Sequence, residues 1–179
     1  MKEETGFTLT ELITTIAIAA LLIGIAVPAF QETIASSRLT SAANQFIAAL
    51  NLARSEAIKR NIRVTVCPSN DQATCTGGSQ YEQGWIVFVD GDNNGAIAAA
   101  TDLIQATTAL PTGLTLTNTT IPDTFISYTS SGSSKRATGG FQAGTLTLCK
   151  TGYTTQSRRI VIAQGGRAQV VVDRPANGC

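Results

Sequence analysis

Histidine is absent from the 179-residue sequence. Histidine is the commonest general base in enzymes, the usual activator of serine and cysteine nucleophiles, and the commonest metal ligand. Its absence removes the residue on which most hydrolytic and metal-dependent sites depend. The sequence therefore predicts a protein that is not an enzyme, with no catalytic residue, no metal and no cofactor.

Cysteine is scarce, and its four copies lie too far apart for the C-x-x-C spacing of a structural zinc site. Disulfides are the favoured interpretation, with reduced and buried cysteines as the alternative. Of the three possible connectivities, the sequence analysis selects Cys67–Cys75 and Cys149–Cys179, because each bridge closes a local segment; the sequence alone does not decide between them. Such bridges persist in an oxidising compartment, which indicates the periplasm or the cell surface.

The formal net charge of +1 hides a strong asymmetry along the chain. Residues 64–134 hold six acidic residues and no basic one, whereas residues 135–179 hold seven basic residues and only one acidic residue, Asp173. The globular part is therefore predicted to have an acidic and a basic half.

Residues 7–30 form one long apolar run, FTLTELITTIAIAALLIGIAVPAF. As a helix it would reach about 36 Å, enough to cross a hydrocarbon core of about 30 Å, so a single membrane pass is expected. A removable secretory signal is disfavoured because MKEETG lacks the basic leader region and no small-x-small cleavage site follows the run. An ordinary anchor is disfavoured by Glu11, since a carboxylate in lipid normally has a partner.

The stretch Gly6-Phe7-Thr8-Leu9-Thr10-Glu11-Leu12 resembles the prepilin signature. That resemblance implies cleavage after Gly6 by a prepilin peptidase and methylation of the new terminal Phe7. It also implies that Glu11 pairs with the terminal amine of a neighbouring subunit during filament assembly. On this basis residues 1–6 are a cleaved leader and residues 7–30 a transmembrane and filament-core helix.

Residues 31–60 are predicted to form the amphipathic half of the same helix. Pro28 predicts a kink or local melting before it. Apolar residues then recur at spacings of three and four, as in a helix with one buried face. They are Leu39, Ala43, Phe46, Leu50, Ala53 and Ala57. This stripe should pack on the head.

Residues 61–179 are predicted to form a β-rich head. Strand-like runs occur at residues 63–67, 85–89, 114–117, 125–128, 146–149, 160–163 and 169–172. The polar stretch from Thr129 to Gly140 is predicted to be a mobile loop that buries little. The expected fold class is α+β, of the type IV pilin kind, with a long N-terminal helix packed on a small antiparallel β head.

The segment DGDNNG at residues 90–95 matches the first half of an EF-hand calcium loop, which makes Asp90, Asp92 and Asn94 weak calcium candidates. The second half of the motif fails, because its twelfth position is Thr101 rather than glutamate and a predicted strand precedes the loop. A hairpin turn is the favoured interpretation.

Two segments of the head carry a second resemblance. They are Gly84 to Asp90 (GWIVFVD) and Leu148-Cys149 followed by Arg159 to Ile162 and Gly166-Arg167. They resemble the GspH/FimT family of minor pilins and pseudopilins, whose members prime the assembly of type IV pili or type II secretion pseudopili. DNA-binding members are associated with a C-terminal G-R-x-R motif, in which Gln169 here replaces the second arginine.

Four arginines near the C-terminus form a candidate DNA-binding patch, since guanidinium groups bind phosphates. They are Arg158, Arg159, Arg167 and Arg174. The alternative, which the sequence analysis favours, is a solvated basic face or one that meets the acidic region of a neighbouring subunit.

Together these patterns predict a minor pilin, structural or priming, at or near the tip of a type IV pilus. A type II secretion pseudopilin and a DNA-binding pilin are the alternatives. The predicted location is the inner membrane with a periplasmic head, followed by the cell surface after assembly. The predicted partners are other pilins or pseudopilins, the prepilin peptidase, the inner membrane before assembly and, in the third alternative, double-stranded DNA.

Overall fold

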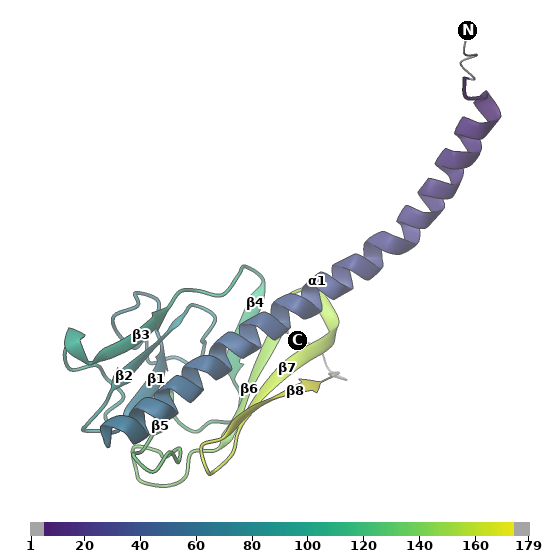
Figure 1. The fold of residues 1–179 in the computed structure, drawn as a ribbon. Helices are drawn as coiled ribbons and strands as arrows, with labels where there is room; N and C mark the ends of the chain where they lie inside the picture. Colours follow the sequence, from purple (N-terminus) through teal and green to yellow (C-terminus); the bar gives the residue numbers. More distant parts are fainter. Residues whose placement is uncertain (1–5, 174–179) are drawn as a thin grey trace. The chain divides into compact units, whose positions relative to one another are not determined.

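The structure is a computed structural model that describes residues 6–173. These residues belong to two compact units, which divide between Ser37 and Arg38. One helix, α1 (Leu9–Arg60), runs through both units and is followed in the second unit by strands, loops and one short 3-10 helix (Figure 1). It is unbroken at Pro28, so the predicted local melting does not occur.

In the first unit, α1 is a helix whose apolar side chains are exposed. Leu12, Ile16, Leu21 and Ile25 are each at least half exposed. This is the one helix of the described chain that is long and apolar enough to cross a membrane, judged by length and composition. Apolar exposure on this scale requires a covering layer of lipid or protein.

The second unit contains eight strands in two antiparallel sheets. The first sheet has the order β3-β2-β1-β5, formed by β1 (Val64–Pro68), β2 (Trp85–Val89), β3 (Leu103–Thr107) and β5 (Ile126–Tyr128). The second has the order β4-β6-β7-β8, formed by β4 (Leu114–Asn118), β6 (Gly144–Lys150), β7 (Tyr153–Ile162) and β8 (Ala168–Asp173). A short 3-10 helix, η1 (Ala100–Asp102), precedes β3.

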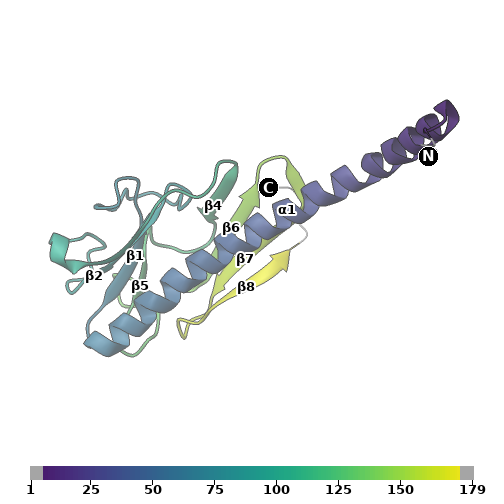
Figure 2. The same ribbon diagram turned by 45° about the horizontal axis from the view of Figure 1, so that its top comes forward.

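The second half of α1 lies along both sheets (Figures 1 and 2). All six members of the predicted apolar stripe, Leu39 to Ala57, are fully buried. Phe46 at its centre makes edge-on contacts with the rings of Tyr81 and Trp85, each with 5.1 Å between ring centroids. The stripe therefore forms the helical side of the core.

The predicted strands are present, with corrections at two places. Strand β3 was not predicted, because its sequence LIQAT is less apolar than the run WIVFV of β2, the strand with which it pairs. The predicted strand at residues 160–163 covers only the apolar end of β7, which begins at Tyr153, where it pairs with Lys150 of β6, and is joined by β8 from Ser157 onward. Pairing with a neighbouring strand can make a strand of residues that show no apolar alternation.

The segment from Thr129 to Gly140 is not the loosely attached loop that was predicted. Ser134 is fully buried, and its hydroxyl donates to the carbonyl oxygen of Gln142 at 2.5 Å. Backbone bonds from Lys135 to Ser127 and from Arg136 to Gly140 hold the rest of the segment. The hydroxyls of Thr129, Ser131 and Ser133 bond one another within the segment, which gives a polar sequence a structural role.

Candidate functional site

The start of α1 carries the residues of the prepilin signature. Thr8 immediately precedes the helix, and its backbone N–H and hydroxyl donate to Glu11 Oε2 at 2.9 Å and 2.7 Å. The backbone N–H of Glu11 in turn donates to Thr8 Oγ1 at 3.3 Å. This is a capping box, in which the first and fourth residues of the helix start satisfy one another.

Gly6 and Phe7 lie just before this capping box, outside the helix. Phe7 is largely exposed, and a Cβ placed on Gly6 would meet no atom within 4 Å. Residues 1–5 of the predicted leader lie outside the described range. Cleavage after Gly6 and methylation of Phe7 therefore remain predictions.

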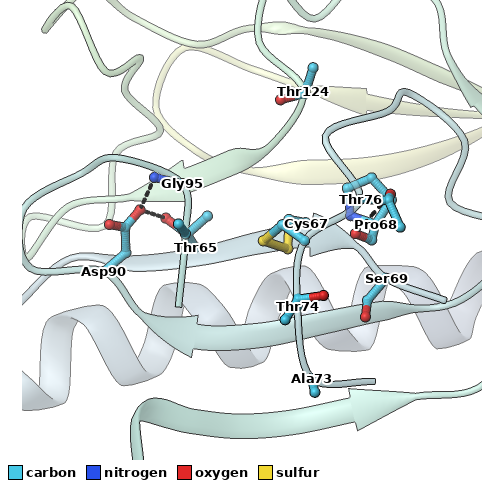
Figure 3. The surroundings of a disulfide bond; sticks show 12 residues. Thr65, Cys67, Pro68, Ser69, Ala73, Thr74, Thr76, Asp90, Gly95 and Thr124 are labelled. Carbon is cyan, nitrogen blue, oxygen red and sulfur yellow. Dashed lines mark hydrogen bonds between the residues drawn. A yellow bond between two sulfur atoms is a disulfide. The ribbon is translucent and has the colours of Figure 1, made fainter. Parts of the chain in front are cut away.

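Cys67 at the end of β1 is joined by a disulfide to Cys75, the pair that the sequence analysis selects (Figure 3). The short loop between them is held by Asp71, whose carboxylate accepts from the side chains of Ser69 and Thr74. It also accepts from the backbone N–H groups of Ala73 and Thr74. Hydrogen bonds from Thr74, Ala73 and Ser69 hold the pKa of Asp71 well below its usual range.

Cys149 on β6 is also disulfide-bonded. Its predicted partner, Cys179, lies outside the described residues. The strand order places β8, which ends at Asp173, two strands away from β6, or about 10 Å. Five residues lie between Asp173 and Cys179 in the sequence, enough to span that distance.

The calcium candidates occupy the connection between antiparallel strands β2 and β3, as expected of a hairpin. Asp90 is buried, and its carboxylate accepts from Thr65 Oγ1 at 2.7 Å and from the backbone N–H groups of Asn94 and Gly95 (Figure 3). Burial raises the pKa of Asp90. Its oxygen atoms thus stabilise the connection.

Asp92 and Asn94 are likewise engaged within the connection. Asn94 Nδ2 donates to Asp92 Oδ2 at 2.7 Å, and Asn94 Oδ1 accepts from Ala96 N–H at 2.7 Å. Between residues 6 and 173, no group of three or more acidic, cysteine or histidine side chains is placed to hold a metal ion. The geometry supports the hairpin interpretation of this segment.

The candidate DNA-binding arginines do not share one surface. Arg158 is buried, and its guanidinium donates to Gln156 Oε1 and to Thr40 Oγ1, each at 3.2 Å, so that it ties β7 to α1. The prediction that Arg158 reaches phosphates is therefore wrong, because its side chain points into the protein. Arg159, the next residue of the strand, points to the opposite face and pairs with Asp173 at 3.1 Å.

Arg167 is exposed at the end of the hairpin between β7 and β8. The hairpin closes with the N–H of Ala163 donating to the carbonyl oxygen of Arg167. Arg159 lies four residues before Ala163, so about 13 Å of strand separates it from the hairpin end. Arg174 lies outside the described residues.

Arg54 on α1 is a neighbour of Arg167 that the sequence analysis assigned only to the polar face of the helix. Its Nη2 donates to the carbonyl oxygen of Gly165 at 3.2 Å. Gly165 lies in the turn of the β7–β8 hairpin, two positions before Arg167. More than one hundred residues separate Arg54 from Arg167 in sequence. Only the tertiary fold brings them together, so no local signal reveals the pair.

The comparisons with known proteins agree with this architecture. The family model described as Type II transport protein GspH matches residues 42–166, which is more than half of the chain. The chain belongs to the GspH family. This is a family of structural pilins and pseudopilins rather than enzymes. No curated protein sequence matches the chain significantly.

Solved structures of two such proteins share the fold. The type IV minor pilin FimU of Pseudomonas aeruginosa has a TM-score of 0.60 at 23% identity, covering 76% of this chain and 90% of FimU. The minor pseudopilin EpsH from the Type 2 Secretion System of Vibrio cholerae has a TM-score of 0.52 at 18% identity. That match covers 75% of this chain and 96% of EpsH. A long helix packed on antiparallel sheets is thus the type IV pilin-like fold that was predicted.

Proposed function

We propose that this GspH-family member is a minor pilin that serves as a structural or priming subunit at or near the tip of a type IV pilus. The observation that carries the proposal is the single helix α1. Its first part exposes apolar side chains, and its second part buries an apolar stripe in the head. One continuous element can therefore couple a soluble head to a filament core.

The exposed apolar part of α1 needs one environment before assembly and another afterwards. The inner membrane supplies the first, with the head in the periplasm, where the disulfide between Cys67 and Cys75 is stable. The helices of other pilins supply the second. Release from one environment to the other requires processing by a prepilin peptidase after Gly6.

A role in type II secretion is the competing assignment, since the family includes pseudopilins and EpsH shares the fold. The position in a type IV pilus is preferred because FimU matches with the higher TM-score of the two. DNA uptake is not proposed, because Arg158 is buried and Arg159 is ion-paired.

The test is deletion of the gene in its own host, with complementation by the full-length chain. We expect fewer surface pili and loss of twitching, both restored by complementation, with the chain present in sheared pili at far lower abundance than the major pilin. Intact piliation together with loss of protein secretion would instead assign the chain to the type II secretion system.

A further inference from the structure

One end of the head, where α1 terminates, combines unpaired cations with exposed apolar side chains. We call it the basic end surface and define it by Arg54, Ile58, Arg63, Lys135, Phe141 and Arg167. Ile58 and Phe141 are 52% and 59% exposed. The segments that contribute these residues are far apart in sequence.

Close backbone contacts bring α1 and the β7–β8 hairpin together on this surface. A Cβ placed on Gly132 would lie 2.9 Å from Ile58 Cδ1 and 3.1 Å from Arg54 Nε. A Cβ placed on Gly166 would lie 2.4 Å from the carbonyl oxygen of Gly132. The helix, the 129–140 segment and the hairpin therefore pack tightly beneath Arg54 and Arg167.

The remaining residues join the surface through the same segment. Arg63 Nη1 donates to the carbonyl oxygen of Lys135 at 3.3 Å and to Ser127 Oγ at 3.4 Å. Lys135 Nζ lies 5.9 Å from the centre of the Phe141 ring. Arg54 and Arg63 are thus oriented by hydrogen bonds to neutral acceptors, with their positive charges left for another partner.

No described carboxylate neutralises these cations. The ion pairs on this part of the chain use Glu56 for Lys59 and Arg60, and Asp123 for Arg136. Arg54, Arg63, Lys135 and Arg167 make no ion pair with any residue between 6 and 173. Four uncompensated cations around two apolar side chains indicate a surface that is completed by another molecule.

We propose that the basic end surface docks onto an acidic and apolar surface of a neighbouring filament subunit, an inference that rests on the proposed function. Filaments grow through head-to-tail interfaces, in which a surface of one subunit meets a different surface of the next. Arginine and aromatic residues are enriched at protein interfaces. Guanidinium groups already held by backbone carbonyl oxygens lose little freedom on binding.

A protein partner fits better than nucleic acid because Ile58 and Phe141 lie among the cations. Apolar side chains add contact area against a protein, whereas they add nothing to phosphate contacts.

The experiment uses the full-length chain in its own host, with a photo-crosslinking amino acid at Phe141. Sheared filaments are analysed by mass spectrometry, and yields are normalised to the amount of chain incorporated. The test variant carries both Arg54→Glu and Arg167→Glu. A second variant carries Arg167→Glu alone, and because this position is exposed, it provides the test if the double variant misfolds. The matched control is Arg38→Glu with Lys150→Glu, two cations outside the surface.

We expect crosslinks to a carboxylate-rich segment of another pilin subunit. Their yield should fall about tenfold or more in the double variant, less in the single variant, and not in the control. Unchanged yields in both test variants, or a crosslinked segment without acidic residues, would overturn the inference while leaving the proposed function intact. Binding of a duplex of about 30 base pairs by the detergent-solubilised chain, lost in the double variant, would replace the protein partner with DNA. Absence of the wild-type chain from filaments would instead refute the proposed function itself.

Discussion

Thr8 and Glu11 satisfy one another across the first turn of α1, and both bonds from Thr8 end on the same carboxylate oxygen, Oε2. No described residue donates to Oε1. Glu11 can therefore cap its own helix and still offer one oxygen to an external amine. A capping role and a pairing role for this carboxylate are compatible, and they make different predictions for substitutions.

Glu11→Gln should abolish incorporation into filaments as fully as Glu11→Ala. Glutamine preserves the capping box but carries no charge, whereas alanine removes both features and costs the helix start about 1 kcal/mol. The measurement is the amount of chain in sheared filaments relative to the membrane. Thr8→Val, which weakens the cap and keeps the carboxylate, is the control and should still be incorporated. Near-normal incorporation of the Gln variant would show that capping, not charge, is what matters.

Gly166→Ala should destabilise the head by about 1 kcal/mol or more. Gly166 has a φ of 77°, and a Cβ there would collide with the carbonyl oxygen of Gly132. Its neighbour is the matched control, because a Cβ on Gly165 meets nothing within 4 Å; Gly165→Ala should change stability by less than about 0.5 kcal/mol. Unfolding of the detergent-solubilised chain in urea, followed by the fluorescence of buried Trp85, gives both values. Equal effects of the two substitutions would argue against this packing.

Much of this architecture could be predicted from local patterns. The buried stripe on α1 follows from helical spacing, and β1 and β2 follow from short apolar runs bounded by turns. Strand β3 and the first half of β7 could not be predicted in this way, because neighbouring strands stabilise them. Local patterns report which residues are apolar, and say little about polar residues that become ordered by pairing.

The candidate site shows the same limit. Charge counting indicated a basic C-terminal half, but it could not show that Arg158 points into the core while Arg159 points outward. It also assigned no site to Arg54, which meets the hairpin only in the folded head. Side chains alternate between the two faces of a strand, and this alternation decides which arginines of β7 face solvent. The faces can be assigned only when the pairing register of the strand is known.

Asp71→Asn should lower the stability of the head at neutral pH, and the loss should shrink in acid. Hydrogen bonds from Thr74, Ala73 and Ser69 hold the pKa of Asp71 below its ordinary value, so the folded state favours the charged carboxylate. A depressed folded pKa contributes stability above the unfolded pKa of about 4, and that contribution is lost as the pH falls below it. The difference in unfolding free energy between the two proteins, measured from pH 7 down to about pH 2, should therefore narrow. A constant difference would contradict the role of the charge.

Cys67→Ser with Cys75→Ser should reduce the unfolding free energy by about 2.5 kcal/mol, as expected for a short closed loop. Urea unfolding of the variant and of the wild type provides the comparison. The same wild-type preparation also tests the second bridge: peptide mapping without reductant should recover a fragment that joins Cys149 to Cys179. Recovery of a free thiol at either position would refute the second bridge.

The most direct test of the whole account is the mass of the chain recovered from sheared filaments. A pilin stem that begins at the capping box predicts a protein that starts at N-methylated Phe7, has lost residues 1–6 and carries two disulfides. Gly6→Val should leave the leader in place and keep the chain out of the filaments. Recovery of the wild-type chain only from membranes, with Met1 intact, would contradict its assignment as a filament subunit.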